Sequence, residues 1–207
     1  GASASLATAI IRAFYDFFDA ELPQKDLLFY ANFSENITHG KSSGIDVATV
    51  NSEHPLWFIK DSTIEPFELN LHGFIVIGDT GVHGFTSQAI NIVREKLVEE
   101  KEKTQDSINH LGQLATDSKD FLMTDKLKEF GHVMNKAHER LSDLGVSHPR
   151  LDNLVETARK NGALGAKLTG SGLGGVMVAL AENEKDAIRI SQRLLNNGAK
   201  NTWIYSF

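Results

Sequence analysis

Apolar residues recur three or four positions apart in three stretches of the chain, at residues 6–19, 85–103 and 124–144. This spacing places them on one face of a helix, so each stretch predicts an amphipathic helix. The second pattern can be followed as far as Leu114. Prolines and an asparagine in helix-starting positions predict three more helices. One covers residues 24–34, one begins at Pro149, and one covers residues 184–197.

Short apolar runs predict strands between these helices. Buried strands are expected at Phe74–Ile77 and Val176–Ala181, and two others at residues 57–60 and 202–205. From about residue 70 onward the order is strand, helices, strand, strand, helix, strand. This order predicts an α+β sandwich of the ferredoxin-like kind, preceded by a separate N-terminal part with a boundary near residue 68.

The stretch from Lys167 to Gly175 holds four glycines within six residues, directly before the Val176 strand. Such a loop either needs positive φ angles for a tight turn or exposes backbone N–H groups to an anion. Thr169 and Ser171 would add hydroxyl donors and Lys167 a positive charge. Neither common nucleotide motif fits, because this loop leads into a strand, and Gly40-Lys41-Ser42 lacks the earlier glycine of a phosphate-binding loop.

Three other polar segments are candidates for a site. In the first, Ser3 and Ser5 open a helix, where they either cap it or help its N-terminus hold a phosphate. The second, Glu35–Asp46, reads as a loop in which Asp46 is either a turn anchor or a general base. The third, residues 79–86, carries Asp, Thr, His and two glycines.

Composition narrows the class of protein. The 207 residues are 41% hydrophobic and 23% charged, which is typical of a globular chain. A net charge of −6 argues against a nucleic-acid binder, and no apolar run is long enough to span a membrane. There is no cysteine, which excludes disulfides and thiolate sites and fits a cytoplasmic location.

The histidines and methionines give no sign of a metal site in the sequence. Five histidines lack the spacing of metal ligands and are expected at the surface, whereas two methionines lie on apolar helix faces and are expected in the core. These are His72, His110, His132, His138 and His148, and Met123 and Met134.

Taken together, the polar segments resemble the GHMP small-molecule kinases over essentially the whole chain. Residues 35–46 match E-x-x-x-H-G-x-P-S-G-x-D except that Ser42 replaces proline, and residues 167–175 match K-L-T-G-A-G-G-G-G except at Ser171 and Leu173. The first four residues resemble part of G-L-G-S-S-A. Asn135 and residues 144–151 are similar to the branch of the family that phosphorylates mevalonate.

The resemblance implies a two-domain α+β architecture. Residues 1–67 would be the remnant of a ribosomal-S5-like N-terminal domain that binds ATP and Mg²⁺, and residues 68–207 the ferredoxin-like C-terminal domain. It further implies that the family's first strands and a substrate lysine precede residue 1, so we expect this chain alone to be nearly inactive.

The resemblance also implies chemistry: transfer of a phosphoryl group from ATP to the C5 hydroxyl of mevalonate, with Mg²⁺ as cofactor. Asp46 would be the catalytic base, and Ser3 and Glu35 the metal ligands. His39 and Thr169 would contact the substrate. The nucleotide would be bound by Gly1, Ser3, Ser43, Gly170, Ser171 and Gly172.

Other functions stay open. Phosphomevalonate kinase, mevalonate-diphosphate decarboxylase, homoserine kinase and galactokinase share the scaffold. A non-catalytic metabolite-binding module is a second class, and a structural fragment that forms a homodimer through exposed strands is a third.

Overall fold

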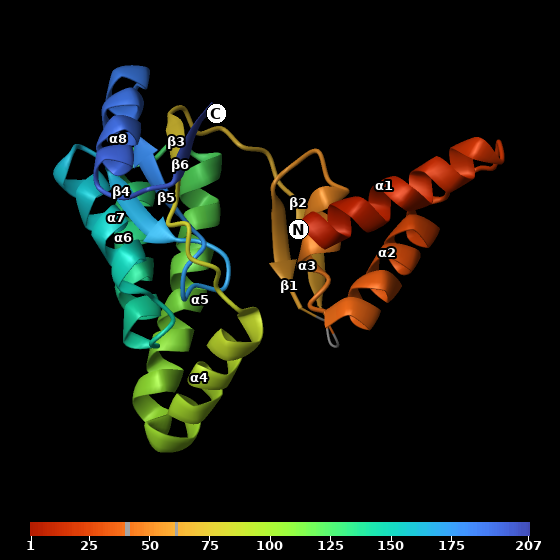
Figure 1. Cartoon of the computed structure of the whole chain (residues 1–207), viewed down its shortest axis with the longest axis horizontal. Helices are drawn as coiled ribbons and strands as arrows, with labels where there is room; N and C mark the ends of the chain where they lie inside the picture. Colours follow the sequence, from red (N-terminus) through yellow and green to blue (C-terminus); the bar gives the residue numbers. More distant parts are fainter. Residues whose placement is uncertain (40–41, 61) are drawn as a thin grey trace. The chain divides into compact units, whose positions relative to one another are not determined.

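The computed structural model describes residues 1–39, 42–60 and 62–207, and for residues 38 and 39 it describes the backbone only. The chain divides into two compact units, Gly1–Leu69 and Asn70–Phe207 (Figure 1).

The first unit consists of three helices and a two-stranded hairpin. The helices are α1 (Ala2–Phe17), α2 (Gln24–His39) and α3 (Ile45–Val50), and the antiparallel strands are β1 (Leu56–Ile59) and β2 (Thr63–Pro66). The helices meet at Ala4, Ala31 and Val47, which are buried. These small side chains let the helix backbones approach closely, so this cluster fixes how the three helices pack.

Two expectations for this unit are wrong. Ser3 and Ser5 do not cap α1, because the helix begins at Ala2 with Gly1 as its N-cap, and the Ser5 hydroxyl donates back to the Gly1 carbonyl over 2.9 Å. Residues 35–46 are not one loop either, since α2 extends to His39 and Asp46 lies in α3. Packing of Val47 against the other helices outweighs the weak helix preference of its β-branched neighbours.

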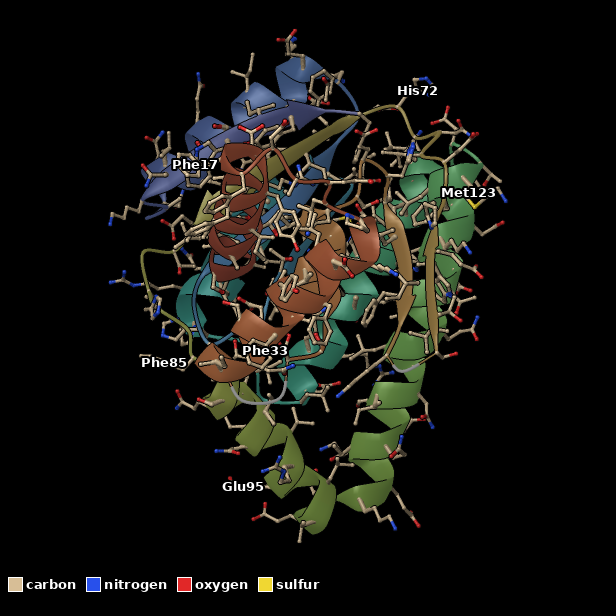
Figure 2. All side chains as sticks on the ribbon, turned by 90° about the vertical axis from the view of Figure 1, so that its right-hand side faces the viewer. Phe17, Phe33, His72, Phe85, Glu95 and Met123 are labelled. Atoms are coloured by element: carbon tan, nitrogen blue, oxygen red, sulfur yellow. The ribbon has the colours of Figure 1, made fainter. Side chains whose placement is uncertain are left out.

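The apolar face predicted for the first helix is largely exposed. Phe17 is 81% exposed, and on α2 Phe33 is exposed as well (Figure 2). Only Ile11 of that face packs against the small-residue cluster, together with Leu28 of α2. The regular spacing therefore predicts the helix correctly without predicting which side chains become buried.

The second unit contains a four-stranded antiparallel sheet. Its strands are β3 (Phe74–Asp79), β4 (Gly165–Leu168), β5 (Val176–Ala181) and β6 (Asn201–Ser206), in the order β4-β5-β3-β6. With helices after the first strand and between the third and fourth, this is the ferredoxin-like order, which confirms the predicted fold class.

The core of this unit lies between one sheet face and two helices, α7 (Pro149–Lys160) and α8 (Glu184–Asn196) (Figure 1). Alternate strand residues such as Ala166, Leu168 and Met177 point into it, as expected for a sheet covered on that face. Asn183 caps α8 by accepting from the Asp186 N–H over 3.0 Å, as predicted.

Three more helices complete the unit: α4 (Thr86–Glu99), α5 (Lys101–Met123) and α6 (Leu127–Asp143). The helix that was expected to continue past residue 103 is broken at Glu100, where φ is −129° and ψ is 53°. None of the helices in the described ranges combines the length and apolar character needed to cross a bilayer.

Two expected side-chain placements are wrong. Met123 is 40% exposed, because it ends α5 beyond the packed part of the helix (Figure 2). His138 is buried rather than at the surface, because it lies on the same face of α6 as the buried Met134.

Candidate active site

The glycine-rich loop between β4 and β5 is left-handed over most of its length. Gly170, Gly172, Gly174 and Gly175 all have positive φ, between 71° and 134°, and Leu173 joins them with a φ of 58°. Side-chain-bearing residues pay a steric cost in this region, which glycine avoids. The predicted need for positive φ is therefore confirmed.

Three glycines are also required by close backbone contacts. A Cβ atom on Gly172 would lie 1.9 Å from the Val146 carbonyl oxygen, and one on Gly174 would lie 2.7 Å from the Val82 carbonyl oxygen. A Cβ on Gly84 would in turn lie 2.2 Å from the Gly172 carbonyl oxygen. Packing explains these three glycines without any ligand.

Gly170 differs from them. A Cβ added there would meet no atom within 4 Å, so no packing contact requires a glycine at this position. The backbone at Gly170 therefore faces open space, as a site for an approaching anion requires.

Hydrogen bonds tie the loop to residues 79–86, the other polar segment of this unit. The Gly175 N–H donates to the Val82 carbonyl over 2.7 Å. The N–H and the hydroxyl of Thr80 both donate to the Gly175 carbonyl, over 3.0 and 2.7 Å. The glycine-rich loop and residues 79–86, two of the predicted polar segments, are thus held against each other by hydrogen bonds.

A third contact holds the middle of the loop. The Leu173 N–H donates to the Val146 carbonyl over 2.8 Å, in the turn that precedes α7. Among the residues that the structure describes, none of the bonds that anchor the loop uses the N–H of Gly170 or Ser171. Those two groups lie in the part of the loop where a phosphate would be expected.

A pocket of about 480 Å³ opens beside Ser171. Most of its lining residues belong to α4 and are mainly apolar, and its polar lining residues are Thr86, Arg94 and Ser171. Its lining residues are Thr86, Ala89, Ile90, Val93, Arg94, Leu97, Val146 and Ser171.

Lys167 does not present its charge to the middle of the loop. Its ammonium donates to the Leu168 carbonyl over 2.6 Å, at the end of β4. Burial lowers the pKa of the Lys167 ammonium, because desolvation disfavours the charged form. Thr169, a predicted substrate contact, follows it and donates its N–H to the Val176 carbonyl over 3.1 Å.

In the first unit, Glu35 is the notable acidic residue. It is only 3% exposed, and its Oε1 atom has no hydrogen-bond partner among the described residues. Glu35 lies one turn after Ala31 on α2, so it faces the same side as the small-residue cluster. A buried carboxylate oxygen without a partner is costly, and a bound cation would satisfy it.

The other two predicted functional side chains of this unit come from its remaining helices. Ser3 precedes the buried Ala4 on α1, and Asp46 precedes the buried Val47 on α3. The Asp46 side chain is 55% exposed, with one carboxylate oxygen 3.6 Å from the Gly1 nitrogen. The packing of α1, α2 and α3 therefore brings these segments together within the unit.

The turn before α3 is built on hydroxyl groups. The Ser43 hydroxyl accepts from the Ile45 N–H over 3.4 Å, and the Ser42 hydroxyl accepts from the Gly44 N–H over 3.2 Å. The Ser42 N–H also donates to Asn36 over 2.9 Å. Proline, which the resembled motif has in place of Ser42, could make neither of these Ser42 bonds.

Some expectations stay predictions. The His39 side chain lies outside the described part of the structure. Across the described ranges there is no cluster of three His, Asp or Glu side chains, so a metal held by Ser3 and Glu35 would need further oxygens from elsewhere, such as a nucleotide.

Sequence reasoning missed a buried polar group beside the loop. His138 contacts Asp152 and the Leu168 N–H, and Asp152 also accepts from Ser147. A signal was present, since His138 lies four residues after Met134 and three before Leu141, on the apolar face of its helix.

Comparisons with known proteins point to the same family in both units of the chain. Residues 1–52 match the family described as GHMP kinases N terminal domain, and residues 119–200 match GHMP kinases C terminal. The chain is 36% identical over 186 residues to a mevalonate kinase of Pyrococcus horikoshii, an alignment that covers 87% of this chain and 55% of that protein. For Pyrococcus furiosus mevalonate kinase the identity is 35%, with 94% and 59% covered. The chain thus spans little more than half the length of these relatives.

Solved structures give the same result. L. major mevalonate kinase in complex with R-mevalonate matches with a TM-score of 0.92 and 26% identity, over 100% of this chain and 65% of that one. Mevalonate kinase from methicillin-resistant Staphylococcus aureus matches with a TM-score of 0.75 and 34% identity, over 99% and 65%. With both family domains matched and this similarity along most of its length, the chain belongs to the GHMP kinase family.

Proposed function

We propose that the protein carrying this chain transfers a phosphoryl group from ATP to the C5 hydroxyl of mevalonate, which yields 5-phosphomevalonate. The observation that carries this proposal is the similarity, at 33–36% identity, to curated mevalonate kinases along most of the chain. The fold match to a mevalonate kinase bound to R-mevalonate supports the same substrate.

In this proposal Asp46 orients the acceptor hydroxyl and accepts its proton as the oxygen attacks the γ-phosphorus. A carboxylate suits both tasks, and phosphoryl transfer depends chiefly on alignment and charge stabilisation. The half-exposed side chain of Asp46 supports this role, because a group that meets a substrate must be accessible in its absence.

Glu35 and Ser3 are proposed to hold Mg²⁺. The donor set fits the ion, because Mg²⁺ prefers carboxylate, hydroxyl and phosphate oxygens and keeps only a few protein ligands. The unpartnered Oε1 atom of buried Glu35 is the structural observation in favour. When bound, the ion would neutralise charge on the nucleotide phosphates.

The glycine-rich loop is proposed to bind phosphate oxygens through the backbone of Gly170, Ser171 and Gly172. Support comes from the open space at Gly170 and from anchoring bonds that leave the N–H groups of Gly170 and Ser171 out. Gly1 and Ser43 complete the proposed nucleotide contacts, and Thr169 and His39 the proposed substrate contacts.

The test is ADP release by the protein that carries residues 1–207, with Mg·ATP and one acceptor at a time. Mevalonate should give turnover, and phosphomevalonate, mevalonate diphosphate, homoserine and galactose should give none. Turnover with another acceptor alone would overturn the substrate assignment. No turnover with any acceptor would overturn the proposal that the protein is a kinase and favour a binding module.

Phosphomevalonate belongs in the panel because a Streptococcus pneumoniae phosphomevalonate kinase matches with a TM-score of 0.84. At 15% identity that likeness shows the fold alone. No feature of the described residues favours that acceptor over mevalonate.

A further inference from the structure

His138 lies buried beneath the start of the glycine-rich loop. It belongs to α6, its side chain is only 7% exposed, and it reaches two other elements. Its Nε2 atom lies 3.2 Å from Asp152 Oδ1 on α7, and its Nδ1 atom lies 3.3 Å from the backbone nitrogen of Leu168 at the end of β4.

These two contacts define one protonation state. A backbone N–H can only donate, so Nδ1 of His138 must accept from Leu168 and therefore carries no proton. The neutral ring then has its proton on Nε2 and donates it to Asp152. Asp152 is itself held by the Ser147 hydroxyl, which donates to the same oxygen over 2.5 Å.

The imidazole therefore links both sides of the loop to one framework. Leu168 is the last residue before the loop. On the other side, Leu173 donates to the carbonyl of Val146, the residue next to Ser147. Thr169 and Gly170 follow directly after the end of β4, and the Leu168 bond to His138 helps to hold that end together with the pairing to β5.

The surroundings favour the neutral ring. Burial lowers the pKa of His138 first, and the charges of Arg159 on α7 and Lys167 on β4 lower it further. Asp152 acts in the opposite direction through its charge and its hydrogen bond. Protonation would place a second N–H on the ring, facing the Leu168 N–H, and the bond between them would be lost.

We propose that His138 is a positioning residue that holds the glycine-rich loop through Leu168 in its neutral form, and that protonation of His138 releases the start of the loop and weakens nucleotide binding. The loop's part in nucleotide binding rests on the proposed function. The other part of the proposal, that neutral His138 holds the loop, does not rest on the proposed function, because it concerns only hydrogen bonds within this chain.

The experiment measures amide hydrogen exchange in the loop, corrected for the intrinsic effect of pH, from about pH 8 down to about pH 4, because the pKa of His138 lies below its ordinary value of 6.5. Three variants are compared with the wild type. His138→Asn keeps an acceptor for Leu168 that cannot be protonated, His138→Leu removes the acceptor, and His132→Asn changes an exposed histidine of the same helix.

In the wild type, protection of the Leu168 and Thr169 amides, the two bonded N–H groups at the start of the loop, should fall about fivefold toward the acidic end, the equivalent of one lost hydrogen bond. His138→Asn should stay protected throughout, His138→Leu should be poorly protected throughout, and His132→Asn should follow the wild type. Wild-type protection that ignores pH, or a pH response that survives in His138→Asn, would overturn the proposal. If His138→Leu fails to fold, the comparison of the wild type with His138→Asn still tests whether protonation of His138 releases the loop.

A kinetic readout then tests the consequence for nucleotide binding. At low pH the KM for ATP should rise in the wild type and stay level in His138→Asn, with a much smaller change in kcat. A kcat loss with KM unchanged would overturn that half. If no acceptor supports turnover, the exchange data still test His138, so failure of the proposed function and failure of this inference can be told apart.

Discussion

The two units carry candidate functional groups of different kinds. In Asn70–Phe207 the candidate groups belong to the backbone, because glycines let the glycine-rich loop approach residues 79–86 and the turn at Val146 within contact distance. In Gly1–Leu69 the candidate groups are side chains, because Ser3, Glu35 and Asp46 come from three packed helices.

This difference predicts different responses to mutation. Where the backbone forms a site, added atoms disturb the local fold, and activity is lost together with stability. Where side chains form a site, replacing one polar group by a similar one removes chemistry and leaves the fold intact. The first three predictions below test this contrast, and the fourth concerns an ion pair outside the candidate groups; they run from the largest expected effect to the smallest.

The largest effect is expected for Asp46→Asn. Loss of the base should lower kcat for ADP release by about 100-fold or more. The unfolding free energy in urea should stay within about 0.5 kcal/mol of the wild type, because the side chain is half exposed. Asp16→Asn, at an exposed position on α1, is the control and should retain full turnover. Wild-type turnover in Asp46→Asn would remove that residue from the mechanism.

Gly172→Ala should act on stability instead. The left-handed backbone alone costs about 1–2 kcal/mol with a side chain, and the overlap of the new Cβ with the Val146 carbonyl adds to it. Gly170→Ala has a similar φ but open space around the Cβ, so its unfolding free energy should fall only by the amount due to the left-handed backbone. Urea unfolding measures both. Equal losses in the two variants would mean that close backbone approach does not matter here.

Glu35→Gln should separate metal binding from folding. Without Mg·ATP the variant should be as stable as the wild type or more stable by up to about 1 kcal/mol, because a buried charge is replaced by a neutral amide. Saturating Mg·ATP should raise the wild-type unfolding free energy by about 2–3 kcal/mol and the variant's by less than half of that. The exposed Glu53→Gln serves as the control. A full Mg·ATP shift in Glu35→Gln would contradict the assigned ligand.

The smallest effect concerns Asp125, which lies between α5 and α6 of the second unit. Its pKa lies below the ordinary value of 3.8, because the His72 backbone N–H and then its ring donate to the carboxylate. A lowered folded-state pKa stabilises the fold above about pH 3.8, and that contribution is lost as the pH falls through the lowered value. The unfolding free energy of Asp125→Asn should show a slightly shallower decline below that pH. An identical decline in both proteins would mean that the pair contributes nothing.

Much of the second unit could be predicted from the sequence. The continuous apolar runs at Phe74 and Val176 specify buried strands, and Pro149 and Asn183 specify helix starts by mechanisms that are local. The glycine density of residues 170–175 specifies positive φ for the same reason, since the steric preference belongs to the residue itself.

The rest depends on tertiary packing, which local patterns do not encode. The short helix that carries Asp46 exists because Val47 packs against Ala4 and Ala31, and its own residues prefer strands. Burial of His138 is a similar case, because its partners Asp152 and Leu168 lie 14 and 30 residues further along the chain. Which glycines face open space and which face neighbouring backbone also needed coordinates, since Gly170 and Gly172 look alike in the sequence.

The most direct test of the central proposal is to identify the product. The protein that carries this chain should be incubated with Mg·ATP and mevalonate, and the phosphorus resonance of the product examined for coupling to the protons on C5. A phosphate monoester at C5, formed by the wild type and absent with Asp46→Asn, is the predicted result. A phosphate ester at another oxygen, or the same product at an undiminished rate from the variant, would contradict it.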